Sequence, residues 1–274
     1  MTHPLPLTGE RTLPAVPGEE YWFARHEAAY LWAARALGER LRGAVVLEAG
    51  SGEGYGADLL RRTGARAVVA LELDAAAVTH AGTAYPSVGS VRANLAAMPI
   101  ARGSVDVVVS MQVVEHLWDL RGFLRGCATA LRPGGLLLVS TPNRPVFSPG
   151  LGRGERPTNP FHVEELDADQ LRDLLAGAGF LDVELHGLHH GERIARWERH
   201  EGATLVAAQV EAALAAAPRP DVTGRVVVSG HGKQPHHQGH PEGLERSVAT
   251  VTTHDFVVGA ADGSQDLLAV AVRP

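Results

Sequence analysis

Residues 44–56 read Ala-Val-Val-Leu-Glu-Ala-Gly-Ser-Gly-Glu-Gly-Tyr-Gly, a short apolar run that breaks at once into alternating glycines. The apolar run, Val45 to Leu47, is typical of a buried parallel strand. Glycine lets the backbone turn tightly and approach a ligand with no Cβ in between. In open α/β sheets, a loop of this kind between a strand and a helix holds a nucleoside-like cofactor. The stretch therefore predicts an α/β fold with a cofactor site at this loop.

Two details of the loop indicate which cofactor it holds. The dinucleotide pattern G-x-G-x-x-G would need its third glycine at position 55, which is Tyr55. An acidic residue, Glu48, stands two positions before the first glycine. Glu-x-Gly-x-Gly-x-Gly resembles the first motif of class I S-adenosylmethionine-dependent methyltransferases. The resemblance implies a set of cofactor-binding residues in this loop: Glu48, Gly50, Ser51 and Gly52.

The composition limits the class of protein. The chain has 274 residues, 45% of them apolar, enough for one large α/β domain. Its single cysteine, Cys127, excludes an internal disulfide and a cysteine-based zinc cluster and fits a reducing compartment. No apolar run is long enough to cross a membrane, and Met1 to Gly18 lacks the pattern of a signal peptide. The net charge of −6, with both signs interspersed, argues against a nucleic-acid partner. We therefore expect a cytoplasmic protein without a membrane or nucleic-acid partner.

The alternation of strand and helix patterns predicts a doubly wound, mainly parallel sheet. Residues 1–18 are expected to form an extended arm and residues 19–274 a single domain, with an insertion at about 189–248. Within that insertion, residues 191–217 predict a long helix and the histidine-containing residues 229–243 a mobile segment. The predicted strands are 45–47, 68–73, 88–93, 105–110, 136–141 and 181–187, followed by two closing strands at 251–258 and 266–272.

Further motifs follow in the order that the methyltransferase family shows. Glu72 ends the second strand, where an acidic side chain can accept hydrogen bonds from both ribose hydroxyls, and Leu73 follows it. Asn94 and Leu95 close the third strand, where the resemblance implies a partner for the adenine edge. Two more segments resemble family motifs, at residues 104–110 and 131–135. Together these motifs imply the seven-stranded, Rossmann-like sheet of class I methyltransferases, with S-adenosylmethionine as the methyl donor.

Residues 112–116, Gln-Val-Val-Glu-His, follow the fourth strand and are expected at the carboxyl edge of the sheet, beside the cofactor. Small-RNA 2'-O-methyltransferases and ubiquinone-pathway O-methyltransferases carry Glu-x-x-Glu-His here and use it, with a later histidine, to bind a divalent cation. In this chain the later histidine ends Asn159-Pro160-Phe161-His162. The resemblance implies a site for Mg²⁺ or Mn²⁺ with four ligands: Gln112, Glu115, His116 and His162.

Glutamine in the place of the first glutamate brings an oxygen but no charge, so we expect weaker affinity for a hard cation. Glu115, His116 and His162 are also the catalytic candidates, and Gln112 is in addition a candidate cofactor contact. The alternative is a metal-free site in which His116 or His162 is the general base.

A cation chelated by two neighbouring hydroxyls makes one of them easier to deprotonate, which suits a vicinal diol and therefore a sugar. The chain also resembles the mycobacterial-type sugar 1-O-methyltransferases of methylmannose polysaccharide biosynthesis, at residues 20–26, 112–116, 159–162, 253–256 and 266–270. This resemblance implies a short mannoside as the acceptor and its 1-hydroxyl as the position methylated. We expect a small-molecule sugar partner, a homodimer, and four acceptor contacts: Tyr21, His26, Asn143 and His189.

Three other classes of protein share part of this pattern. A nicotinamide-dependent oxidoreductase would need the dinucleotide pattern and a catalytic Tyr-Lys or Cys, yet the one lysine, Lys233, lies in the histidine-containing segment. An RNA 2'-O-methyltransferase would share the Glu-His pair and the later histidine, but would need a basic groove. A binding module that kept the fold would not turn over S-adenosylmethionine.

Overall fold

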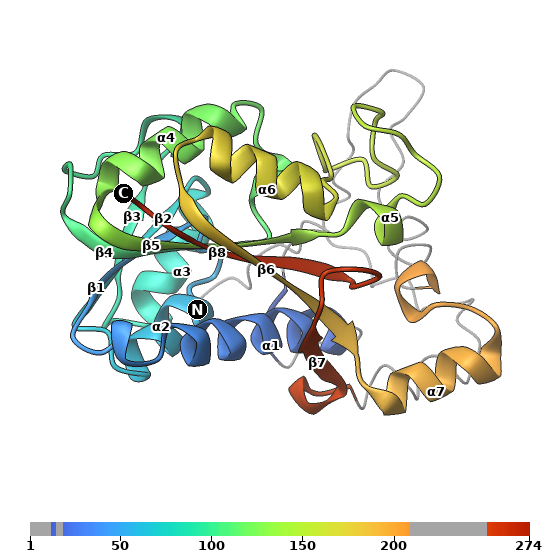
Figure 1. Ribbon diagram of the computed structural model, residues 1–274. Coiled ribbons are helices and arrows are strands. Elements are labelled where there is room, and N and C mark those ends of the chain that lie inside the picture. Colours follow the sequence, from blue (N-terminus) through green and yellow to red (C-terminus); the bar gives the residue numbers. More distant parts are fainter. Residues whose placement is uncertain (1–11, 15–18, 209–250) are drawn as a thin grey trace, which may run out of the picture.

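Eight strands of the described residues form one mixed sheet in the order β3-β2-β1-β4-β5-β8-β6-β7 (Figure 1). The computed structural model describes residues 12–14, 19–208 and 251–274. The first five strands in this order are parallel, β8 is antiparallel to both β5 and β6, and β7 is antiparallel to β6. The strands are β1 (Val45–Ala49), β2 (Ala67–Glu72), β3 (Gly89–Arg92), β4 (Val105–Met111), β5 (Leu131–Pro142), β6 (Leu181–His190), β7 (Phe256–Gly259) and β8 (Asp266–Val272).

Helices cover both faces of the sheet (Figure 1). On one face lie α1 (Glu20–Leu37), α2 (Tyr55–Arg62) and α3 (Ala75–Ala84), and on the other lie α4 (Leu120–Ala130) and α6 (Ala168–Gly177). The short α5 (Arg144–Phe147) and α7 (Glu192–Glu201) lie beyond the carboxyl ends of the parallel strands. Four single-turn 3-10 helices complete the described elements: η1 (Gly38–Arg40), η2 (Leu95–Ala97), η3 (Val114–His116) and η4 (Thr253–Asp255).

The central strands are apolar on both sides because each side chain in turn meets one of the two helical layers. Val46, Val107 and Val109 belong to the core that packs against α1 and α2. Leu47 and Val108 belong to the opposite core, which includes residues of α4 and α6. This two-sided burial produces the continuous apolar runs from which the strands were predicted. The parallel pairing of β1 with β2 and β4 places the carboxyl ends of these strands at one edge of the sheet.

The expected Rossmann-like α/β architecture is confirmed, but the sheet has eight strands rather than seven. The edge strand β7, four residues long and paired with the end of β6, overlaps the predicted closing strand at 251–258. The predicted strand at 251–258 begins instead with η4, because Thr252 and Asp255 form a reciprocal capping box that turns the chain.

The helix predicted over residues 191–217 is shorter than expected in its described part. α7 ends at Glu201, since Gly202 follows with a φ of +71° and a left-handed residue terminates a helix. Residues 209–217 and the predicted mobile segment at 229–243 lie outside the described residues, as does most of the predicted arm. Of that arm, Thr12 is buried, with its hydroxyl 3.4 Å from that of Tyr55.

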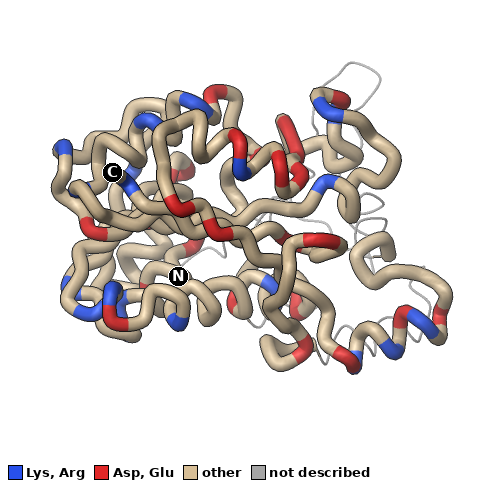
Figure 2. Tube along the Cα trace, viewed as in Figure 1, with Lys and Arg blue, Asp and Glu red and all other residues tan. Residues whose placement is uncertain are grey.

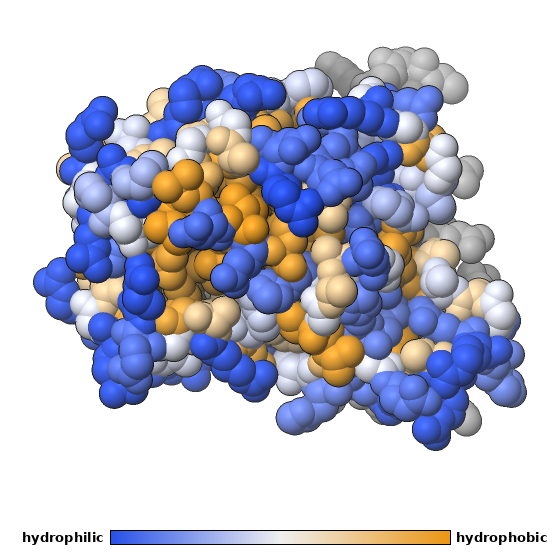
Figure 3. Space-filling model, viewed as in Figure 1, coloured by the Kyte–Doolittle hydropathy of each residue, from blue (hydrophilic) through white to orange (hydrophobic). Residues whose placement is uncertain are grey.

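The surface of the described residues carries charges of both signs, interspersed along the chain (Figure 2). The face shown in Figure 3 is mostly polar, with apolar residues gathered near its middle. None of the described helices combines the length and the hydropathy that a membrane span requires.

Candidate active site

The loop between β1 and α2 has a backbone that glycine alone adopts readily. Gly50, Gly52 and Gly54 have φ angles of +83°, +51° and +88°. At Gly50 a Cβ would also lie 2.5 Å from Cγ2 of Val113, well inside van der Waals contact. Glycine at this position therefore lets the loop lie directly against the segment that follows β4.

Hydrogen bonds tie the glycine loop to the end of β2. The backbone N–H groups of Gly50 and Ser51 both donate to the carbonyl of Leu71, at 2.9 and 3.0 Å. One carboxylate oxygen of Glu72 accepts from the N–H of Gly52 at 3.0 Å. The structure thus brings together the loop residues and the acidic strand-end residue that the sequence predicts for the cofactor. Their contacts with a bound cofactor remain predictions.

One apolar and one amide side chain follow the carboxyl ends of β2 and β3. Leu73, directly after Glu72, is 60% exposed. Asn94 follows β3, and its Oδ1 accepts from the N–H of Ala96 at 2.9 Å, which caps the turn of η2. The amide NH₂ of Asn94 is therefore the group available for the predicted contact with adenine. Leu95 is buried in the core, so a contact from this position would come from its backbone.

Glu48 lies fully buried at the end of β1, next to the glycine loop. Tyr30 of α1 donates its hydroxyl to Oε1 of Glu48 at 2.5 Å, and a Cβ on Gly56 would lie 2.1 Å from that tyrosine ring. Burial raises the pKa of Glu48 to about 8, although the Tyr30 hydrogen bond acts in the opposite direction. Its second oxygen, Oε2, has no hydrogen-bond partner among the described residues. A buried carboxylate oxygen of this kind fits a cationic group of a ligand.

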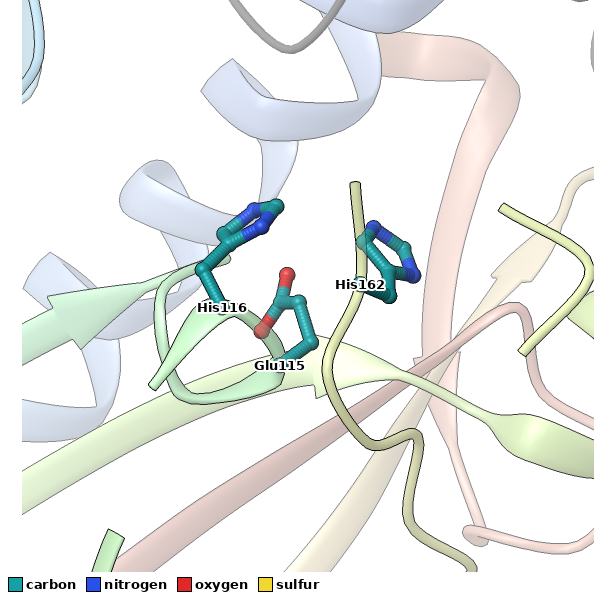
Figure 4. Close-up of side chains that lie close together, drawn as sticks. All are labelled: Glu115, His116 and His162. Carbon is teal, nitrogen blue, oxygen red and sulfur yellow. The ribbon is translucent and has the colours of Figure 1, made fainter. Parts of the chain in front are cut away.

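The second part of the site is a cluster of Glu115, His116 and His162 (Figure 4). Glu115 and His116 come from η3 after β4, and His162 from the loop between α5 and α6. One ligand atom of each residue lies within 4.8 Å of the others, and the Glu115 carboxylate lies between the two imidazoles. The ring centroids of the two histidines are 5.0 Å apart. Three of the four predicted cation ligands therefore meet.

Hydrogen bonds orient both histidine rings. Nδ1 of His116 lies 3.1 Å from the carbonyl oxygen of Phe161, to which a protonated Nδ1 donates. Nδ1 of His162 lies 2.6 Å from Oε1 of the buried Glu165, and its Nε2 lies 3.0 Å from the side-chain nitrogen of Asn159. A proton on each Nδ1 leaves each Nε2 with its lone pair, which is the form that binds a metal or accepts a proton.

A residue of β5 holds the carboxylate of Glu115 in place. Thr141 donates its hydroxyl to Oε2 of Glu115 at 3.0 Å. Burial raises the pKa of Glu115, whereas the neighbouring His116 and His162 act to lower it. A positive charge placed among these three side chains would therefore stabilise the ionised carboxylate.

Comparison with known proteins identifies the family. Residues 47–139 match the family model described as "Methyltransferase domain". A probable S-adenosylmethionine-dependent methyltransferase of Mycobacterium tuberculosis is 47% identical over 98% of this chain and 90% of its own length. This chain belongs to the S-adenosylmethionine-dependent methyltransferases. A probable methyltransferase of the same kind from Mycolicibacterium smegmatis is 45% identical over 98% of this chain and 96% of its own length.

A solved structure supports the fold. The S-adenosylmethionine-dependent methyltransferase of Thermotoga maritima, described as a possible histamine N-methyltransferase, superposes with a TM-score of 0.58. Its sequence is 15% identical, over 93% of this chain and 94% of that one. The glycine loop suits the methyl donor of this family, because S-adenosylmethionine carries cationic ammonium and sulfonium groups and Glu48 offers an unpartnered buried oxygen.

Gln112 does not join the three clustered residues of the methyltransferase. Its Oε1 accepts from Nη2 of Arg25 at 3.1 Å, and its Nε2 donates to Ser140 at 3.0 Å and to Asp266 at 3.2 Å. Its φ of +54° is uncommon for a residue other than glycine. As a metal ligand, Gln112 would have to give up its hydrogen bond with Arg25. Its side chain instead fixes the start of the segment that carries Glu115.

Two of the predicted acceptor contacts lie on α1. The side chain of Tyr21 is 0% exposed in this structure and its hydroxyl lies 2.9 Å from Nε2 of His190, so its contact with an acceptor remains a prediction. An aromatic residue at the start of a helix is compatible both with a place in the core and with a ligand contact. In this structure Tyr21 lies in the core. His26 lies beside the glycine loop, with Nδ1 3.2 Å from the hydroxyl of Tyr55.

The other two predicted acceptor contacts lie near the carboxyl ends of β5 and β6. Asn143 is 4% exposed, and its amide donates to the carbonyl of Ser264 at 2.9 Å, so it ties two loops together. Nε2 of His189 lies 2.6 Å from the carbonyl oxygen of Ala260. Neither belongs to the cluster of Glu115, His116 and His162, and their contacts with an acceptor remain predictions.

Several residues that shape the site were not predicted. Asp266 receives two hydrogen bonds from Arg25, and the side chains are 1% and 3% exposed. Thr141 and Glu165 orient the cluster but carry no motif of their own. The sequence contains a weak indication of Glu165, because it stands three residues after His162. Nothing local in the sequence relates Arg25 to Asp266, which is 241 positions away.

Proposed function

We propose that this methyltransferase transfers the methyl group of S-adenosylmethionine to a sugar hydroxyl, with the aid of a divalent cation. The proposed acceptor is a short mannoside, and the proposed position is its 1-hydroxyl. The observation that carries the proposal is the cluster of Glu115, His116 and His162 beside the glycine loop. Val113, which lies against Gly50, is two residues before Glu115, so its Cα is at most about 7 Å from that of Glu115.

The donor set fits a divalent cation. One carboxylate and two imidazoles suit Mn²⁺ and accommodate Mg²⁺, and each donor has the outer partner that metal sites favour. Glu165 and Thr141 supply two of those partners, and Oε2 of Glu165 is a buried oxygen with no hydrogen-bond partner among the described residues. A bound cation would polarise an acceptor hydroxyl and make it easier to deprotonate.

The side chains of the chain position the acceptor and handle its proton. Methyl transfer from a sulfonium releases a neutral sulfide, so the protein must mainly hold the nucleophile in line and remove its proton. Glu115, kept in place by Thr141, can accept a hydrogen bond from an acceptor hydroxyl.

A metal-independent O-methyltransferase is the second candidate, and one observation favours it. His162 and Glu165 form a buried pair at 2.6 Å, the arrangement that sets a histidine up as a general base. In that case Nε2 of His162 would take the proton of the acceptor hydroxyl directly, once the side chain of Asn159 has moved away from this nitrogen.

The test is a methyl-transfer assay with labelled S-adenosylmethionine over mannose, mannobiose, methyl α-mannoside and maltose, with and without chelator. We expect chelator-sensitive methylation of mannose or mannobiose but not of methyl α-mannoside, whose 1-hydroxyl is blocked. Glu115→Ala and His162→Ala should each lower kcat by about 100-fold or more. The control is His200→Ala, since that side chain is 85% exposed on α7.

Each outcome of the assay separates the candidates. Full rate in both variants would refute the role of the cluster. Activity that survives the chelator but falls in His162→Ala would favour the metal-independent enzyme. Binding of S-adenosylhomocysteine without methylation of any sugar would refute the sugar acceptor and leave the family unchanged.

A further inference from the structure

Two aromatic side chains stand exposed next to the histidines of the cluster. Trp118 is 90% exposed and Phe161 is 47% exposed. A single exposed apolar side chain is common on protein surfaces. Here, however, one such residue belongs to each of the two loops that form the cluster, two positions after His116 and one position before His162.

The backbone that carries Trp118 is fixed on both sides. Its Cα lies at most about 7 Å from that of His116, because two residues cannot span more. Leu117, just before it, packs against the core, and Asp119, just after it, caps α4 by accepting from the N–H of Gly122 at 2.8 Å. The indole is therefore exposed by an ordered segment between the cluster and a helix.

Phe161 is held in the same way. Its N–H donates to Oδ1 of Asn159 at 3.0 Å, and its carbonyl oxygen lies 3.1 Å from Nδ1 of His116. Its Cα is about 3.8 Å from that of His162, as in any trans peptide. The aromatic residues thus flank the cluster from its two loops.

We propose that Trp118, together with Phe161, is the surface on which the acceptor stacks a sugar ring next to the ring that is methylated. This inference rests on the proposed sugar acceptor and assigns the residues that recognise it. A pyranose has a face of C–H groups that packs on an aromatic ring, while its hydroxyls point outward to polar groups. An indole on an ordered backbone loses little conformational entropy when it binds. Tyr21, a predicted acceptor contact, is buried, whereas Trp118 is exposed.

A sugar matches this surface better than a second copy of the chain does. An aromatic side chain buries about 150–250 Å² when it is covered. A stable dimer buries about 800 Å² on each partner, so two such side chains supply well under the area required. One disaccharide, by contrast, is about the size of the surface that they offer.

The experiment compares mannobiose with mannose in wild type, Trp118→Ala and Trp118→Phe. In wild type, kcat/KM should favour mannobiose by about tenfold, the equivalent of one aromatic contact. In Trp118→Ala this preference should fall to about one through a higher KM for mannobiose, with kcat and S-adenosylhomocysteine affinity unchanged. Trp118→Phe should retain most of the preference. The control is Leu181→Ala, which removes a 54% exposed side chain at the start of β6, on the opposite edge of the sheet.

A binding measurement separates this inference from the proposed reaction. Mannobiose added to the complex with S-adenosylhomocysteine should shift tryptophan fluorescence in wild type and in the Leu181 variant, but not in Trp118→Phe. A shift without methylation would support the stacking surface and refute the proposed reaction. Methylation with an unchanged preference in Trp118→Ala would refute the surface alone. Loss of a dimer in Trp118→Ala, seen by sedimentation, with an unchanged preference would assign the surface to a second copy and refute the inference.

Discussion

The glycine loop and the network around Arg25 and Asp266 are built in different ways. The glycine loop is held by backbone hydrogen bonds to the adjacent strand β2, and Glu72 contacts a loop residue 20 positions away. In the network, side chains from distant parts of the chain meet: Arg25 bonds Asp266, 241 positions away, and Tyr21 contacts His190, 169 positions away. The glycine loop thus follows from local backbone geometry, and the network from the closure of the whole fold.

The largest effect is expected from the buried ion pair of Arg25 and Asp266. Arg25→Ala leaves Asp266 as an unpaired buried charge, which should lower the free energy of unfolding by about 3–5 kcal/mol. Chemical denaturation measures this loss. The double variant Arg25→Met with Asp266→Leu should recover most of it, because it removes both charges at once.

An exposed pair serves as the control for that experiment. Arg62 and Asp58 form an ion pair on α2 in which the arginine is 71% exposed, so Arg62→Ala should cost less than about 1 kcal/mol. Equal losses in the two single variants would mean that burial does not distinguish the pairs, and the contrast between the two regions would weaken.

The second effect concerns Glu48 and pH. Its pKa is raised from 4.5 to about 8 by burial, so the folded protein keeps a proton that the unfolded chain loses above pH 4.5. The resulting stability is complete below pH 4.5 and is lost as the pH rises to about 8. The free energy of unfolding of the ligand-free protein should therefore fall with pH more steeply than that of Glu48→Gln, by up to about 1.4 kcal/mol per unit.

Denaturant titrations of wild type and Glu48→Gln at a series of pH values measure this difference. Glutamine keeps an oxygen for the hydroxyl of Tyr30, so the comparison isolates the ionisation. Parallel curves for the two proteins would show that Glu48 does not titrate in this range.

The smallest effect is expected from the glycine loop. Gly50→Ala places a methyl group 2.5 Å from Val113 at a φ of +83°, so the loop must move away from the segment after β4. We expect S-adenosylhomocysteine affinity to fall about tenfold, as measured by calorimetry. The matched control is Gly134→Ala, because its φ is also positive, at +72°, but nothing lies within 4 Å of its Cβ. An equal loss of S-adenosylhomocysteine affinity in Gly134→Ala would mean that backbone strain alone explains the loss in Gly50→Ala.

The sequence predicted well those features that depend on neighbours along the chain. The apolar run of β1 and its glycine loop were found from a single stretch, since a parallel strand and a tight turn each leave a local pattern. The starts of α3 and α4 are local in the same sense, because Asp74 and Asp119 cap these helices and a cap needs only one side chain and the turn that follows it.

Features that depend on distant contacts were predicted less well. Tyr21 was expected to meet the acceptor, but it packs against His190 of β6 and Phe256 of β7, and the sequence near the tyrosine contains no trace of that packing. The carbonyl of Gln112 was expected to bind a cation, yet Arg25 from α1 and Asp266 from β8 meet its side chain. The family pattern supplied the positions of the cluster, whereas the hydrogen bonds around it had to come from the structure.

Helix α1 carries Arg25 and Tyr30 about a turn and a half apart, the first bonded to Asp266 and Gln112 and the second to Glu48. The helix is therefore fixed at two points, and a tilt that breaks one set of these bonds would strain the other. A movement of α1 that releases Glu48 beside the glycine loop would also disturb Gln112, at the start of the segment that carries Glu115.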